Sequence, residues 1–233
     1  MFSSLVTDHW LPSPASAFSD DDAVVVVDPE APENRSVSIL RIGDGATVVS
    51  LSPERADQLG VSDGERLAAD EVLERIDAAG IALNDPDHLF YLPVEEHANV
   101  TAPEPQAKTR RLTAEDADAF AALVAAAPED ELDEAFVELD HWLVFGTFVD
   151  GTLAAAASMY PWKGTRLADL GVITLPEFRG RGLARATVLA MAADALERGY
   201  EPQYRCQLDN APSVALALAS GFRRFGEWIV VDD

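Results

Sequence analysis

The segment 167–199 constrains the fold of this chain more than any other stretch of its sequence. It begins with an apolar run, LADLGVITL, whose β-branched residues predict a buried strand. The glycine-rich hexapeptide RGRGLA and a long helical pattern, ended by Gly199, follow. A strand that leads through such a turn into a helix predicts a mixed α/β fold with helices packed on a sheet.

The hexapeptide is a candidate anion site. The first N–H groups of a helix have no partner within the helix, and its dipole adds partial positive charge there. Gly180 and Gly182 would let the backbone approach a phosphate, while Arg179 and Arg181 would supply charge. The pattern is neither a P-loop nor the three-glycine dinucleotide fingerprint. We expect a pyrophosphate as the ligand, and the simpler alternative is an arginine-flanked helix start in water.

The composition is strongly acidic. The 233 residues include 41 Asp and Glu against 17 Lys and Arg, and the formal net charge is −24. Lysine is nearly absent, which resembles the proteins of salt-loving microbes, where salt screens repulsion between carboxylates. This charge argues against nucleic acid as a partner. One cysteine, Cys206, permits no internal disulfide, and the four histidines lack metal-ligand spacing, so we expect no metal.

No segment predicts export or membrane insertion. The first residues lack the basic and apolar regions of a signal peptide, and no apolar run approaches the roughly 18 residues of a membrane span. We therefore expect a cytoplasmic protein without a membrane partner.

The C-terminal half shows the clearest succession of elements. Strands are predicted at 109–112, 142–149, 151–160, 167–175, 202–208 and 227–231, and helices at 114–127, 129–140, 182–198 and 211–220. Asp150-Gly151 is a strong hairpin signal, and Thr113 with Asp116 resembles a capping box. This order predicts a mixed sheet with helices on it.

The N-terminal half is predicted to be a smaller α+β region. Strands are predicted at 23–27, 36–42, 46–51 and 88–93, with helices starting at Pro53 and covering 68–80. The proline-containing stretch 99–110 predicts a linker. We expect two domains, 1–105 and 108–233, of which the first either helps to form a substrate site or is a degenerate copy of the second.

Two motifs in the second half resemble those of the GNAT acetyltransferase superfamily. Its coenzyme motif, Arg/Gln-x-x-Gly-x-Gly/Ala, corresponds to Arg179, Gly182 and Ala184. Its second element, Asn-x-x-Ala/Ser followed by Gly-Phe, corresponds to Asn210, Ser213 and 221–222. The resemblance covers about 108–231 and implies a GNAT acyl-CoA-binding fold.

The resemblance also implies where acetyl-CoA would bind as co-substrate. The cleft would lie where the strand 168–175 splays from the strand 202–208, and Asn210 and Ser213 would contact the coenzyme near its pantetheine arm. Backbone groups of Val172, Ile173 and Thr174 would pair with that arm, and one N–H would stabilise the oxyanion. The pyrophosphate would rest on the loop residues, which are Arg179, Gly180, Arg181, Gly182, Leu183 and Ala184.

Direct attack by an amine requires a base and benefits from an acid. Asp169 is the first candidate base, because it precedes the coenzyme-contacting part of its strand, and Glu177 and His141 follow. Many relatives protonate the thiolate with a tyrosine, whose position here is Ala217. Either the coenzyme leaves as a thiolate, or a donor such as Ser213, Tyr204 or Tyr160 replaces that tyrosine.

Two functions are compatible with these features. The first is an acetyl-CoA-dependent N-acetyltransferase acting on a small-molecule primary amine or an amino-terminus. The second is a non-catalytic acyl-CoA-binding module, a sensor or interaction protein, which Ala217 would suit. The residues 160–162 (YPW) and the acidic segment 129–140 are candidates for the acceptor side, although plain packing and a solvated surface also explain them. A homodimer is compatible with either function.

Overall fold

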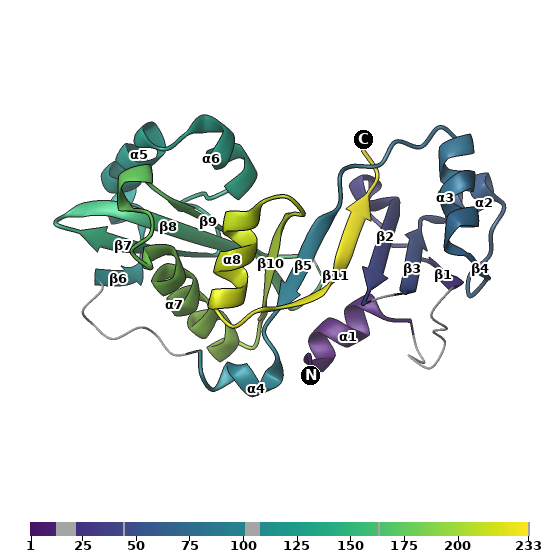
Figure 1. The fold of residues 1–233 in the computed structure, drawn as a ribbon, viewed down its shortest axis with the longest axis horizontal. Coiled ribbons are helices and arrows are strands. Elements are labelled where there is room, and N and C mark those ends of the chain that lie inside the picture. Colours follow the sequence, from purple (N-terminus) through teal and green to yellow (C-terminus); the bar gives the residue numbers. More distant parts are fainter. Residues whose placement is uncertain (13–21, 44, 101–107, 163, 233) are drawn as a thin grey trace. The chain divides into compact units, whose positions relative to one another are not determined.

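The computed structural model describes residues 1–12, 22–43, 45–100, 108–162 and 164–232 (Figure 1). The chain divides into two compact units. The first unit comprises Met1–Val6, Phe90–Arg205 and Ala211–Arg223. The second comprises Thr7–Leu89, Cys206–Asn210 and Arg224–Asp233. Residues 101–107, the centre of the expected linker, lie outside the described residues, and the domain limits 1–105 and 108–233 stay a prediction.

The first unit is a mixed sheet with helices on both faces. Its sheet runs in the order β10-β9-β8-β7-β6, in which β9 and β10 are parallel and the other neighbours antiparallel. The strands are β6 (Lys108–Arg111), β7 (Leu143–Val149), β8 (Thr152–Pro161), β9 (Leu167–Thr174) and β10 (Glu201–Gln207), the last of which ends in the second unit. The longer helices are α5 (Ala117–Ala126), α6 (Glu129–Ala135), α7 (Leu183–Glu197) and α8 (Ala211–Ala219).

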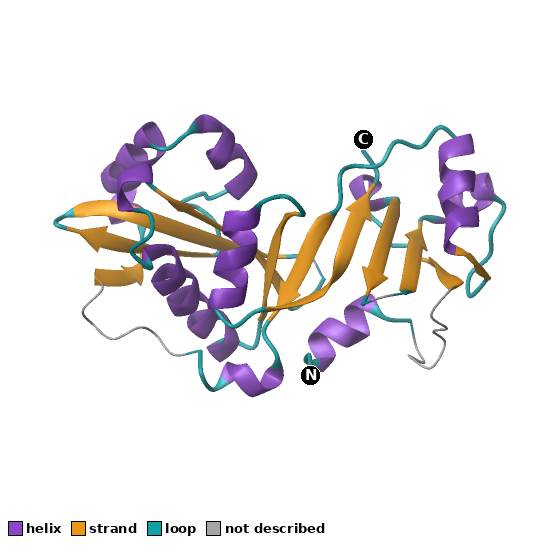
Figure 2. Ribbon diagram, viewed as in Figure 1, coloured by secondary structure: helices purple, strands orange, loops and turns teal. Residues whose placement is uncertain are grey.

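Strand β8 is the centre of this unit. Residues Ala154–Ala157 are wholly buried, because α5 covers one face and α7 the other (Figure 2). Successive strand residues point to opposite faces. Ala156 packs in a cluster with Phe120 and Leu123 of α5. Thr147, opposite Ala155, meets Thr187 of α7 with 2.7 Å between their hydroxyl oxygens. Small side chains therefore let both helix layers lie close to the strand.

The second unit is a smaller mixed sheet packed on two helices. The strands run in the order β4-β1-β3-β2-β11, with β1 and β3 parallel. These strands are β1 (Asp22–Val27), β2 (Val37–Ile42), β3 (Ala46–Leu51), β4 (Arg66–Ala68) and β11 (Arg223–Val230), and the helices are α2 (Pro53–Leu59) and α3 (Ala69–Ala78). Apolar residues of α2 and α3 share one core cluster with β1, β2 and β3.

The predicted elements are confirmed in both units, with changes at some ends. Ser52 caps α2 and Gly60 ends it in the left-handed conformation. The prediction of an acidic helix over 129–140 is wrong in its second half, because α6 ends at Ala135. Phe136 adopts a left-handed conformation with φ of 45°, Val137 enters the core, and the Glu138 N–H donates to Ser158 Oγ at 3.2 Å. The burial of Val137 and the hydrogen bond of Glu138 stabilise a non-helical backbone where the helix was expected to continue.

Several short elements were not expected. They are α1 (Ser4–Trp10), α4 (Val94–His97) and the 3₁₀ turns Glu33–Arg35 and Pro176–Phe178. The 3₁₀ turn Ala114–Asp116 falls within the helix predicted over 114–127, and β5 (Asp87–Tyr91) corresponds to the strand predicted at 88–93. Helices this short are unstable alone and depend on tertiary contacts. Trp10 of α1, for example, packs edge to face on Trp228, with ring centroids 5.6 Å apart. Among the described residues, no helix is long and apolar enough to cross a membrane.

The capping box before α5 leads to a test of stability. Asp116 accepts the Thr113 N–H at 3.0 Å and a pair of bonds from Arg110. Arg110, and then Thr113, hold the pKa of Asp116 at about 2. We expect Asp116→Ala to lower the free energy of unfolding by about 1–2 kcal/mol in urea titrations near neutral pH.

The pH dependence of that loss follows from the sign of the shift. A carboxylate whose pKa is lowered by folding stabilises the fold above its ordinary value of 3.8, and that stabilisation is lost as the pH falls through about 2. The difference between wild type and Asp116→Ala should therefore narrow across this range. Asp118→Ala, in the first turn of α5, is the matched control, and an equal loss in both variants would contradict the assignment.

Candidate functional site

Strands β9 and β10 stop pairing partway along their length. Their parallel register runs from Leu167–Glu201 to Leu170–Tyr204 and ends there. On its other edge, β9 stays paired with β8 as far as Thr174, opposite Ala155. The residues 171–174 therefore keep one strand neighbour only, and an extended ligand could pair with their second edge as an added strand. Val172, Ile173 and Thr174, predicted to meet the pantetheine arm, all lie in this segment.

The glycine-rich loop follows directly after this segment. Gly180 and Gly182 have φ of 70° and 75°, a left-handed conformation that glycine adopts without strain. Gly182 is the N-cap residue of α7, and no side chain caps that end. The N–H groups of Leu183 and Ala184 lie in the first turn, so these amides are available to an anion. The predicted phosphate loop thus has the expected backbone form.

The two arginines of the loop are already engaged. Arg179 donates through Nε to the Thr174 carbonyl at 3.1 Å and through Nη2 to Glu131 Oε2 at 2.5 Å. The guanidinium of Arg181 lies 5.5 Å from the centre of the Phe178 ring. The charge that the sequence suggests for a phosphate is therefore, at Arg179, neutralised by a carboxylate of α6.

Helix α6 also contacts the start of the open segment. A Cβ on Gly171 would lie 1.7 Å from the Ala135 carbonyl oxygen, so only glycine allows the end of α6 to lie against β9. Beyond that end, three rings are in contact. The Phe136 ring centroid is 5.1 Å from His141 and 5.7 Å from Tyr160, and the latter two are 5.0 Å apart. Phe136 is 51% exposed, so one ring of this aromatic cluster faces solvent.

His141 is held in place by a hydroxyl and lies near a carboxylate. Its Nδ1 is 2.8 Å from Ser158 Oγ, and its Nε2 is 3.5 Å from Glu138 Oε2. Ser158 stands opposite Gly171 in the β8–β9 register, next to the pair Ala157–Val172. The imidazole is therefore anchored to the strand position that adjoins the open segment of β9.

Asp169, the first candidate base, is a buried carboxylate with several donors. Its Oδ1 accepts from Gln203 Nε2 at 3.0 Å, and its Oδ2 accepts from Arg205 Nη2 at 2.6 Å and Nε at 2.9 Å. The Tyr160 hydroxyl donates to the same Oδ2 at 3.2 Å. Three of these hydrogen bonds converge on Oδ2 and one reaches Oδ1, so most of the acceptor capacity of this carboxylate is used. Burial, and then the charge of Asp169, raise the pKa of Tyr160 to about 12.

The candidate proton donors Tyr204 and Ser213 differ in their exposure to solvent. Tyr204 is 2% exposed and packs between Phe90 and Phe222, with ring centroids 6.2 and 5.7 Å away. Ser213 is half-buried in the first turn of α8, and Ala217 is fully buried on the same helix. Asn210 immediately precedes α8 and belongs to the second unit.

Cys206 has the properties of a core residue. It is 9% exposed, and burial, followed by the charge of Asp87, raises the pKa of its thiol to about 12. The thiolate, the reactive form, is therefore scarce near neutral pH. Among the described residues, no group of three or more His, Cys, Asp or Glu is placed to hold a metal ion.

Several residues of this arrangement were missed in the sequence. Gln203 and Arg205 are two residues apart in β10, so their side chains point to the same face of the strand. Two polar residues at this spacing in a predicted buried strand are the signal that could have identified them. Phe136 and Ser158 carried no comparable signal. Phe136 gains its place from the end of α6, which the sequence predicted five residues too late, whereas Ser158 lies in β8.

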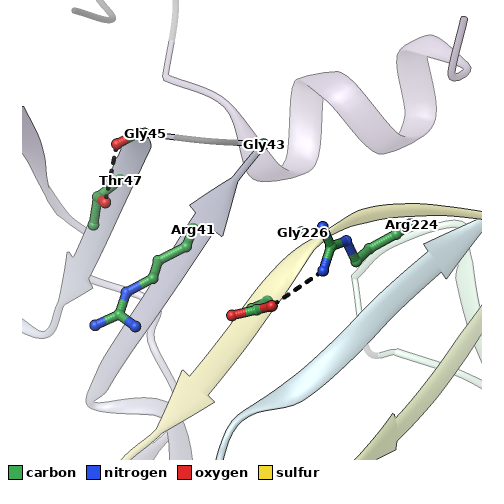
Figure 3. Close-up of a pocket in the computed structure, with 7 residues that line it drawn as sticks. Arg41, Gly43, Gly45, Thr47, Arg224 and Gly226 are labelled. Carbon is green, nitrogen blue, oxygen red and sulfur yellow. Dashed lines mark hydrogen bonds and ion pairs between the residues drawn. The ribbon is translucent and has the colours of Figure 1, made fainter. Parts of the chain in front are cut away.

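The second unit contains a separate hollow of about 210 Å³ (Figure 3). Its lining residues are Arg41, Gly43, Gly45, Thr47, Arg224, Gly226 and Glu227. The hollow is lined by two arginines, Arg41 and Arg224. Arg224 donates to Glu227 Oε1 at 3.3 Å and is therefore paired with a carboxylate. None of the residues predicted to bind or react lines this hollow, and its chemistry suggests no reaction.

Comparisons with known proteins agree with the geometry of the first unit. The sequence model of the Acetyltransferase (GNAT) family matches residues 110–222. An uncharacterized N-acetyltransferase of Bacillus subtilis, YdfB, is 34% identical over 67 residues, which are 29% of this chain and 26% of the relative. The match thus spans about a quarter of that protein.

Two solved structures resemble the chain. A GNAT-family protein from Novosphingobium aromaticivorans is 25% identical with a TM-score of 0.51, and the match covers 65% of this chain and 64% of the other. A GNAT-family acetyltransferase from Colwellia psychrerythraea is 20% identical with a TM-score of 0.53, covering 78% and 75%. The fold therefore resembles that of GNAT-family proteins. Residues 110–222 match the GNAT acetyltransferase family, and the resemblance predicted for the C-terminal half is confirmed.

The contact between α6 and β9 can be tested by adding one methyl group. We expect Gly171→Ala to lower the free energy of unfolding by about 1–3 kcal/mol, because the new Cβ meets a backbone carbonyl and α6 must shift. Gly146→Ala is the matched control, since its Cβ meets the flexible ends of Leu153 and Leu112. Chemical denaturation of both variants measures the difference, and equal losses would contradict the role of Gly171.

Proposed function

We propose that this protein is an acetyl-CoA-dependent N-acetyltransferase that acts on a primary amine of a small molecule or an amino-terminus. One observation carries the proposal. The β9–β10 register ends at Leu170–Tyr204, and the open edge leads directly to an uncapped helix N-terminus behind Gly180 and Gly182. An open edge suits an amide-containing arm, and free helix amides suit a diphosphate. Acetyl-CoA has both groups in this order.

The proposed contacts of the coenzyme use mostly backbone groups. The N–H groups of 180–184 bind the pyrophosphate, and Val172, Ile173 and Thr174 pair with the pantetheine arm. One N–H of these three stabilises the oxyanion that forms when the amine nitrogen attacks the thioester carbon. Asn210 and Ser213 are proposed as further coenzyme contacts, on the strength of their place in the second motif.

The acceptor amine loses a proton during the reaction, and we propose His141 as its acceptor. The imidazole adjoins the open segment of β9 through Ser158, and it is 11% exposed. Asp169 was the first candidate, but it is buried, paired with Arg205 and hydrogen-bonded to Gln203 and Tyr160. We therefore propose that Asp169 positions Tyr160, whose ring belongs to the aromatic cluster.

The carbon–sulfur bond then breaks and the electron pair leaves with sulfur. The residue at the usual tyrosine position is Ala217, which is buried, and Tyr204 is enclosed by two phenylalanines. A thiol ionises near pH 8.5, so a thiolate is an acceptable leaving group near neutral pH. We propose departure as the thiolate, with Ser213 as the remaining candidate donor.

Binding without turnover is the second candidate function, and Ala217 favours it. Calorimetry with acetyl-CoA in high salt tests what both functions share, and an absence of binding heat would overturn both. Release of free thiol in the presence of a panel of amines then separates them. An enzyme releases thiol faster with at least one amine than in buffer, whereas a binding module does not.

The phosphate loop is tested by Gly182→Val. A branched side chain disfavours the left-handed conformation of Gly182 and so misplaces the first amides of α7. We expect acetyl-CoA binding to weaken by at least about tenfold in calorimetry while the fold is retained. Gly80→Val is the matched control: φ there is 68°, no atom lies within 4 Å of the added Cβ, and it belongs to the second unit. Unchanged binding in Gly182→Val would show that the phosphate lies elsewhere.

The base is tested by His141→Ala with added imidazole. Loss of a general base typically costs about a hundredfold or more in rate, and free imidazole can replace the missing ring. We expect a fall in kcat that imidazole partly restores, and a smaller fall in Asp169→Asn that imidazole does not restore. Steady-state thiol release measures both. A His141→Ala variant with an unchanged kcat would remove His141 as the base.

A further inference from the structure

Arg179 joins the phosphate loop to helix α6. Its Nη2 lies 2.5 Å from Glu131 Oε2, and its Nε lies 3.1 Å from the Thr174 carbonyl oxygen. Thr174 is the last residue of β9, and Gly180 is the first glycine of the loop. The guanidinium is therefore bound to a carboxylate at the point where the open edge of β9 meets the loop.

The Glu131 carboxylate binds the guanidinium of Arg179 in a position where a phosphate group could bind it instead. Arg pairs with carboxylates and phosphates through the same donors, and it binds both in charge-assisted hydrogen bonds. Glu131 comes from the first turn of α6, where Glu129 and Asp130 add further negative charge. A diphosphate that approaches the loop thus meets an arginine whose charge is already compensated, together with a carboxylate that repels it.

The Arg179–Glu131 pair is accessible enough to be exchanged. The side chains are 45% and 40% exposed, so solvent screens the pair and its stabilising effect is small. The contact between Ala135 and Gly171 holds the other end of α6 independently of this pair. Loss of the ion pair therefore need not displace the helix, and Glu131 can yield Arg179 to a better ligand.

We propose that Glu131 sets the affinity for the coenzyme by competing with its diphosphate for Arg179. This inference rests on the proposed function. In the free protein the carboxylate of Glu131 holds the guanidinium, and in the complex a phosphate oxygen takes its place. Glu131 is thus an internal competitor, and it makes acetyl-CoA binding weaker than the loop alone would allow.

Calorimetric titration of the full chain with acetyl-CoA tests this proposal through Glu131→Gln. Glutamine keeps the size of the side chain and removes its charge. We expect the Kd of Glu131→Gln to be about two- to fivefold lower than that of wild type at roughly 0.05 M salt, the range that an exposed ion pair supports. The gain should shrink near 1 M salt, where the screening length falls to about 3 Å.

Two further variants separate competition for Arg179 from general repulsion. Asp130→Asn removes a neighbouring negative charge from the same turn, and it should change the Kd less than Glu131→Gln does. In an Arg179→Gln background, Glu131→Gln should lose most of its effect, because no guanidinium remains to be released. A gain that persists in this background, or equals that of Asp130→Asn, would overturn the competition.

The outcomes also separate this inference from the function on which it rests. If wild type binds acetyl-CoA and Glu131→Gln binds it equally well or more weakly, Glu131 is not a competitor and the proposed function stands. If neither wild type nor Glu131→Gln binds at any salt concentration, the proposed function itself fails. Binding by Glu131→Gln alone would support both.

Discussion

Strand β9 can pair with β8 along its length, but it pairs with β10 only as far as Leu170. The proposed coenzyme site depends on this incomplete register. A parallel strand in the middle of a sheet normally uses both edges. Here the second edge opens just before the chain turns through two left-handed glycines into α7. The open edge and the uncapped helix end are thus consecutive parts of one backbone segment, and they need no distant side chain to form them.

Much of this segment could be predicted from the sequence. The apolar run at 167–175, the glycines of RGRGLA and the helical period after them each have a local cause, so strand, turn and helix follow from neighbouring residues. The capping box at Thr113 and Asp116 is local in the same sense. The strand, the turn and the start of α7 were therefore predictable, and so was the resemblance of this part of the chain to GNAT acetyltransferases.

The side-chain part was less predictable, because it depends on contacts between distant residues. Arg179 was expected to face a ligand, but its partner Glu131 lies 48 residues away in the sequence. Asp169 was expected to accept a proton, but three residues that donate to it come from β8 and β10. The place of Phe136 depends on where α6 ends, and that end depends on the burial of Val137. No local pattern encodes such pairings.

The alanine run of β8 has a consequence for how this protein could change over evolution. The residues Ala154–Ala157 are wholly buried between α5 and α7, so a larger side chain there would push one helix layer outward. Variation is far easier at Phe136, Glu138 and Asp140, whose side chains are exposed, while Val137 is buried in the core. If the proposed function holds, new acceptor preferences would arise through these exposed positions, while the central strand stays unchanged as a fixed spacer between the helix layers.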